Sequence, residues 1–213
     1  NTTDGIVYGG AIGFGFGMTE NFLYFISYTE SLESWIFLVI IRTLFTAVMH
    51  CVSTATFGAF LGYAKFSPPI KKFTMPFIGF FVAVFIHSAW NFSVSFESTT
   101  LIGGIFLVFT IGLFIAIFRM SVSNESKMIY KELSEESDLG LIPFQHLHIL
   151  NSELRNKLGW IDESIRKEYV KSAITLAFRK MQERNSTGFN RLFYQSEIFH
   201  FRNKIRDILN IQP

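Results

Sequence analysis

Long apolar runs separated by short polar stretches fill the first 120 residues of the chain. Four such runs are present, at residues 5–28, 35–63, 73–92 and 101–120. A helix needs about 20 apolar residues to cross the hydrocarbon core of a bilayer, so each run predicts a membrane-spanning helix. The second run is longer than that, and we expect tilting or a break within it to take up the excess.

The pattern changes in the second half of the chain, where polar and apolar residues mix at helical spacing. Apolar residues recur every three to four positions in 125–136 and 162–184, and a last helix is expected at 197–209. The sequence therefore predicts an all-α, polytopic membrane protein with about four transmembrane helices. Residues 1–120 form its transmembrane core, and residues 121–213 form a cytosolic helical tail.

Charge follows the same division. The chain carries 19 Lys and Arg and 17 Asp and Glu, with a formal net charge of +2. This balance gives no sign of a nucleic-acid partner, and we expect none. Only ten of these charged residues precede residue 121: Asp4, Glu20, Glu30, Glu33, Arg42, Lys65, Lys71, Lys72, Glu97 and Arg119.

Loop charges predict the orientation of the spans. The loop between the second and third runs is basic, whereas the other two loops carry acids and no Lys or Arg. The positive-inside rule places the basic loop in the cytoplasm, together with the tail. The residues that decide this are Lys65, Lys71 and Lys72 on the inside and Glu30, Glu33 and Glu97 on the outside.

Small residues in the first run favour close packing against a neighbouring helix. Gly9 and Gly13 form a GxxxG pair, as do Gly13 and Gly17. The single cysteine, Cys51, excludes an intrachain disulfide and a cysteine-cluster metal site. It follows His50 directly, but adjacent helical residues point about 100° apart, so we interpret Cys51 as a core residue rather than a nucleophile.

Three ionisable side chains interrupt the apolar runs, which makes each a candidate functional group. Glu20 lies in the first run, His50 in the second, and His87, with Asn91 one turn later, in the third. Each lies 15 or 16 residues from the nearest expected cytosolic marker, which is roughly 22–24 Å along a helix. The markers are Asp4, Lys65 and Lys72 respectively. We therefore expect one shared polar site, in the outer half of the membrane.

A carboxylate, two imidazoles and an amide suit hydrolysis of a peptide bond. Glu20 is the candidate general base for water, and a histidine or Asn91 stabilises the oxyanion. No cofactor is expected, with zinc held by Glu20, His50 and His87 as the alternative. The same groups also fit a proton or cation path, or polar ties between packed helices. Arg42, near the outer end of its helix, is expected to snorkel or to pair with an acid.

Several short motifs give the chain a family resemblance. The stretches 4–9 and 15–21, Phe16-x-x-x-Glu20, Arg42 followed by His50, and His87-x-x-x-Asn91 occur in this order. Together they resemble the PrsW family of intramembrane proteases, which is related to the type II CAAX prenyl proteases.

The resemblance implies an intramembrane endopeptidase in a bacterial or archaeal cell membrane. Its partners would be membrane lipid and a membrane-anchored protein substrate. The reaction would resemble the first-site cleavage of an anti-sigma factor. The carried-over catalytic residues are Glu20, His50, His87 and Asn91.

One motif of the family is missing from the sequence. A Glu-Glu-x-x-Lys/Arg motif, which supplies the glutamate usually assigned as water activator, should precede residue 4. The chain opens at Asn1 without a methionine, so we expect a fragment or processed product, inactive if that glutamate is absent. Glu132 and Glu136 lie in the tail and cannot replace it. The alternative function is a non-catalytic membrane binding or scaffold protein that uses the same polar pocket.

Overall fold

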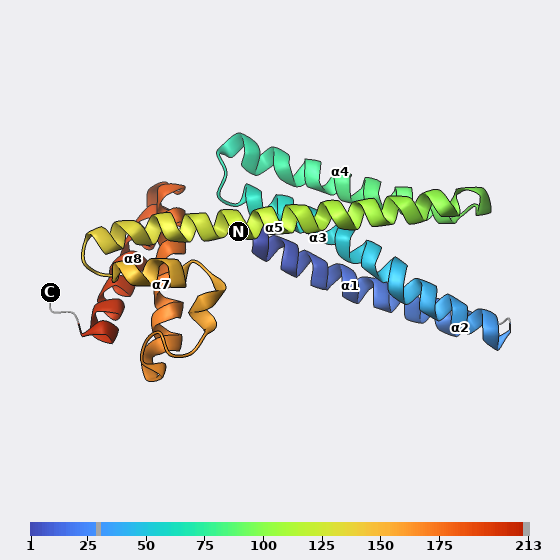
Figure 1. Ribbon diagram of the computed structural model, residues 1–213. Coiled ribbons are helices and arrows are strands. Elements are labelled where there is room, and N and C mark those ends of the chain that lie inside the picture. Colours follow the sequence, from blue (N-terminus) through green and yellow to red (C-terminus); the bar gives the residue numbers. More distant parts are fainter. Residues whose placement is uncertain (29–30, 211–213) are drawn as a thin grey trace. The chain divides into compact units, whose positions relative to one another are not determined.

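The computed structural model describes residues 1–28 and 31–210, and these residues form helices and connecting turns without any strand (Figure 1). The chain divides into two compact units, Asn1–Ser121 and Val122–Pro213. Glu30, one of the acids expected in an outer loop, lies outside the described residues.

The first unit consists of four helices and the beginning of a fifth. Asn1 begins the first helix with a capping box, in which its side chain accepts from the Asp4 N–H and Asp4 reaches back to the N-terminus. The helices are α1 (Thr2–Ser27), α2 (Leu32–Ile41), α3 (Ala47–Ala64), α4 (Pro69–Val94) and α5 (Thr100–Asp138), with a 3₁₀ turn η2 (Glu97–Thr99) before the last.

Helices α2 and α3 form one rod that is interrupted by a π-helical segment, η1 (Arg42–Thr46). In this segment the N–H of Ala47 donates to the carbonyl of Arg42, five residues earlier. The interruption expected in the long second run is therefore a widened turn rather than a kink at proline or glycine.

Three helical stretches in the described residues are long and apolar enough to cross a membrane: Leu32–Ala64, Pro69–Val94 and Glu97–Asp138. The chain is a helical membrane protein, as predicted. Helix α1 is not among the three, and its six glycines lower its hydropathy. A total of four spans stays a prediction.

Glycines at every fourth position of α1 form its contact with α3 (Figure 1). Gly5 lies against Gly58, and Gly13 lies against the backbone of His50, so the two helices run antiparallel. A Cβ at either position would overlap main-chain atoms of α3. The predicted GxxxG packing is confirmed, and it extends one turn further to Gly5.

Helix α4 packs on another side of α3. The Ser53 hydroxyl donates to the Ala83 carbonyl at 2.7 Å, which ties the two helices at their crossing. Met49, Trp90 and Leu107 form a buried cluster among α3, α4 and α5. These contacts fix the side of α3 that α4 occupies.

The second unit has its own core around the end of α5. It contains α6 (Leu147–Leu150), α7 (Glu163–Arg184), α8 (Gly188–Leu209) and the 3₁₀ turns η3 (Phe144–His146) and η4 (Glu153–Asn156). The predicted helix at 125–136 is the last part of α5, because no glycine or proline occurs between Gly112 and Gly140, where φ is +74°. The core is made by residues such as Ile129, Leu133, Tyr169, Leu176 and Ile205.

Candidate functional site

A glycine of α1 allows the first two candidate groups to meet. A Cβ on Gly17 would lie 3.0 Å from both the Ala47 Cα and the His50 Cδ2, so only a hydrogen side chain lets α3 come this close. Glu20 follows Gly17 by one turn and is brought beside His50 by the same approach.

The carboxylate of Glu20 joins α1 to the long second rod. Its Oε2 lies 2.8 Å from His50 Nε2 and accepts from Arg42 Nη2 at 3.0 Å. The Glu20 side chain is 33% exposed, whereas that of His50 is 6% exposed. The carboxylate therefore shares one oxygen between a cation and an imidazole, and Oε1 has no hydrogen-bond partner among the described residues.

Helix α4 supplies the other two candidate groups. The rings of His50 and His87 lie 4.8 Å apart between centroids, tilted by 43°. The Asn91 Nδ2 lies 3.5 Å from His87 Nε2, at the long limit of a hydrogen bond. The structure thus brings Glu20, His50 and His87 into one cluster, with Asn91 beside it, as their matched depth predicted. Their catalytic role stays a prediction.

The sequence did not identify all the residues that shape this cluster. Arg42 pairs with an acid, which is one of the two arrangements expected for it. Asn21 is fully buried and bonds to Arg42, and the ring of Tyr24 lies 3.5 Å from the Arg42 guanidinium carbon. An amide directly after an acid within an apolar run was the available signal for Asn21.

Two neighbours of His50 support its ring and its backbone. The edge of the Phe16 ring packs against the imidazole, with centroids 5.1 Å apart. The Thr54 hydroxyl donates to the His50 carbonyl. Cys51 is a half-buried free thiol that faces Gly10 of α1. This contact agrees with a packing role for Cys51.

The arrangement has the parts of an acid and base site. Glu20 Oε2 orients the His50 imidazole, as a carboxylate orients a histidine in many hydrolases. Glu20 Oε1 has no hydrogen-bond partner among the described residues. This oxygen and the adjacent His87 ring can exchange protons with a water molecule. The Asn91 amide adds a donor on the α4 side of the cluster.

The cluster matches a zinc site in the type of its ligands but not in their arrangement. One carboxylate and two imidazoles are a common zinc ligand set. However, the described residues include no group of three or more His, Cys, Asp or Glu side chains placed to hold a metal ion. Glu20 Oε2 also faces the Arg42 guanidinium, a cation that opposes a second one at the same oxygen. The chemistry proposed for these residues therefore involves no metal ion.

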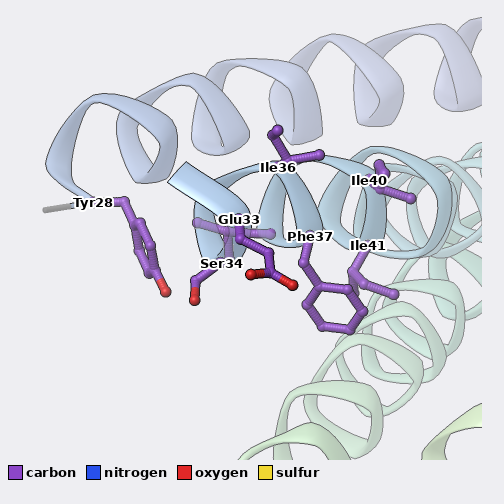
Figure 2. Close-up of a pocket in the computed structure, with 8 residues that line it drawn as sticks. Tyr28, Glu33, Ser34, Ile36, Phe37, Ile40 and Ile41 are labelled. Carbon is purple, nitrogen blue, oxygen red and sulfur yellow. The ribbon is translucent and has the colours of Figure 1, made fainter. Parts of the chain in front are cut away.

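The pocket in Figure 2 is separate from this cluster. It lies along α2 and is lined mainly by apolar side chains, including Phe37 and Ile41, which Figure 2 shows on the same side of the helix. None of the four candidate residues lines it.

Comparison with known proteins gives one family match and one related protein. The profile of a family described as PrsW family intramembrane metalloprotease matches residues 1–119. Protease PrsW of Shouchella clausii (strain KSM-K16) is 32% identical over 92 residues, which are 43% of this chain. The chain spans about two fifths of the length of this curated relative. No solved structure matches the chain.

Proposed function

The chain belongs to the PrsW family of intramembrane metalloproteases, and on this premise we propose that it is an endopeptidase that hydrolyses a peptide bond in a membrane-anchored protein. The observation that carries the proposal is the 2.8 Å contact of Glu20 Oε2 with His50 Nε2, beside the ring of His87. Three helices contribute these groups, and the fold holds them together within an otherwise apolar bundle.

Each residue has a role that follows from its surroundings. Glu20 and His50 act as a pair that takes a proton from the attacking water. His87 and Asn91, on one face of α4, stabilise the oxyanion that forms at the scissile carbonyl, and the protonated Glu20–His50 pair gives its proton to the leaving amine. Water attacks the carbonyl carbon, the C–N bond breaks, and the products are a carboxylate and an amine.

The finer proposal concerns the substrate. By the loop charges, the cluster lies in the outer half of the membrane and the second unit lies in the cytoplasm. A single-span protein cut near its outer membrane boundary fits this depth, and first-site cleavage of an anti-sigma factor is a reaction of this kind.

Cleavage of a single-span test substrate in lipid vesicles tests the proposal. The protein is expressed from its complete gene, and turnover is compared with that of His50→Ala and His87→Ala. We expect losses of about 10²- to 10⁴-fold, the usual contribution of a positioned acid or base. Cys51→Ser is the matched control, because the half-buried thiol takes no part in the proposed chemistry. Unchanged turnover in both alanine variants would reject these roles.

The same assay separates the two alternatives. Substrate that co-purifies with the protein but is never cut would favour the non-catalytic binding function. Loss of turnover with a chelator, restored by Zn²⁺, would assign Glu20, His50 and His87 as zinc ligands. Turnover that survives the chelator would assign the reaction to the side chains alone.

A further inference from the structure

A widened helical turn lies next to the candidate site. The π-helical segment η1 begins at Arg42, whose carbonyl accepts from the Ala47 N–H. Single π-turns inside α-helices are uncommon, and they are frequent at functional sites because they change the direction of the side chains that follow. His50 lies on the helix directly after this turn, so its direction depends on the register that the turn sets.

Asn21 bonds to both the backbone and the side chain of Arg42. Its Nδ2 donates to the Arg42 carbonyl at 3.0 Å, and its Oδ1 accepts from Arg42 Nε at 3.0 Å. The side chain of Asn21 is fully buried. A carboxamide presents a donor and an acceptor side by side, so it satisfies both groups at once, which neither a carboxylate nor a hydrocarbon side chain does.

One turn of α1 surrounds the guanidinium of Arg42. Besides the bond to Asn21, its Nη2 donates to Glu20 Oε2 at 3.0 Å, and its carbon lies 3.5 Å from the centroid of the Tyr24 ring. The guanidinium is thereby fixed on two edges and one face. It meets Glu20 through a single nitrogen, which leaves the same carboxylate oxygen in contact with His50.

We propose that Asn21 is a positioning residue, which sets the π-turn and holds Arg42 so that Glu20 is shared between Arg42 and His50. This inference rests on the proposed function for its catalytic consequence. Without the amide, the Nε of Arg42 is buried and unpaired, and the guanidinium turns to bind Glu20 through two nitrogens. His50 then loses the carboxylate that orients it.

Two variants of similar size test the proposal. Asn21→Asp keeps the acceptor for Arg42 Nε but sets an oxygen against the Arg42 carbonyl, and Asn21→Leu removes both bonds. We expect kcat to fall by about 10- to 100-fold with little change in KM, the loss typical of residues that orient an active group. Thr19→Val is the control, because the Thr19 hydroxyl is exposed and bonds only to the Gly15 carbonyl of its own helix.

A second readout does not require cleavage. In protein labelled with ¹³C-histidine, the ring signals of His50, assigned with His50→Gln, should shift in both Asn21 variants but not in Thr19→Val. If wild-type protein cleaves nothing while these signals shift, the proposed function fails and the positioning role stands. Unchanged His50 signals and unchanged kcat in a folded Asn21→Asp protein would overturn the positioning role.

Wild-type protein provides the measurement if the variants do not fold. Labelled with ¹⁵N-arginine, it should show an Arg42 Nε–H that exchanges with solvent much more slowly than those of exposed arginines such as Arg184, which is 45% exposed and binds Glu135 through Nη2. An Arg42 Nε–H that exchanges as fast as these would contradict the bond to Asn21 and the proposal with it.

Discussion

Two carboxylates, one in each unit, bind cations in different ways. Glu20 of the first unit is one-third exposed, binds Arg42 and His50 through a single oxygen, and keeps its other oxygen without a partner among the described residues. Glu136 of the second unit is fully buried. It binds Arg202 through both oxygens, at 2.8 and 2.7 Å, and Lys180 at 2.6 Å.

The Glu136 network is a structural tie between three helices. Lys180 of α7 also donates to the Glu132 carbonyl and pairs with Glu135, and Arg202 belongs to α8, so α5, α7 and α8 are joined at the buried Glu136 carboxylate. The donors that face Glu136 are Lys180 Nζ and the Nε and Nη2 of Arg202, and each of them is paired. A buried ion pair of this kind specifies an arrangement of helices more than it adds net stability.

The difference shows how a reactive carboxylate is distinguished from a structural one. Both clusters contain an acid and cations between packed helices. In the second unit both oxygens of Glu136 are paired with cations, whereas in the first Glu20 orients an imidazole and keeps one oxygen without a partner among the described residues. Incomplete pairing, next to a second imidazole, is the feature that suits Glu20 to chemistry.

Breaking the buried pair should give the largest effect on stability. Glu136→Ala removes the carboxylate that Arg202 and Lys180 share, and breaking a buried pair costs about 3–5 kcal/mol, reduced by the contact that Lys180 keeps with Glu135. Hydrogen exchange of amides in residues 122–210 of the whole protein would measure this loss. Glu168→Gln is the control: its pair with Lys204 is exposed, so exchange should not change. If Glu136→Ala leaves the second unit intact, the network is not a structural tie.

Separating α1 from α3 should give an intermediate effect, on the first unit alone. A Cβ from Gly13→Ala would overlap the Thr54 hydroxyl and the His50 carbonyl, and such overpacking costs about 1–3 kcal/mol. We expect a lower resistance to detergent unfolding and weaker cleavage, because Glu20 and His50 move apart. Gly15→Ala, two residues away with open space around it, should leave both measurements unchanged. Equal behaviour of the two variants would refute the packing argument.

The smallest effect should come from pH, on the second unit. Burial lowers the pKa of His146, whose Nδ1 lies 3.1 Å from the Tyr169 hydroxyl. The unfolded chain, with a histidine pKa near about 6.5, binds the proton more readily. Stability is therefore full above that value and is lost as pH falls below it, by at most about 1.4 kcal/mol per pH unit.

Hydrogen exchange of residues 122–210 at a series of pH values would measure this slope. His146→Gln should flatten it, whereas His148→Gln, which removes a ring stacked on Tyr130, should leave it in place. A slope that survives His146→Gln would assign the pH dependence to another group.

Much of the candidate site was predictable because the number of residues along a helix gives the distance along its axis. Glu20, His50 and His87 were expected at one depth, since rise per residue converts sequence distance into height. Depth does not specify direction around the helix axis. The extra width of the π-turn at Arg42–Thr46 changes that direction, and no spacing rule marked where the turn would form. Asn21 was missed for the same reason, because its partner is the Arg42 carbonyl at the start of that turn.

In the tail, too, one feature was predictable from the sequence and another was not. The periodicity at 162–184 predicted α7 (Glu163–Arg184) closely, because its start is capped by Asp162 and its pattern is regular. The expected boundary near residue 120 is not a break in the helix, since polar residues alone do not end a helix, and no glycine or proline occurs between Gly112 and Gly140.

Local hydropathy, residue size and spacing were enough to predict the helical membrane class and the glycine face of α1. They also identified the chemical types of the candidate residues. Tertiary packing decided which atoms meet. It placed one oxygen of Glu20 between Arg42 and His50, and it enclosed Glu136 among cations. Such pairings depend on the rotation and separation of helices distant in the chain, which close packing fixes only once the whole bundle has formed.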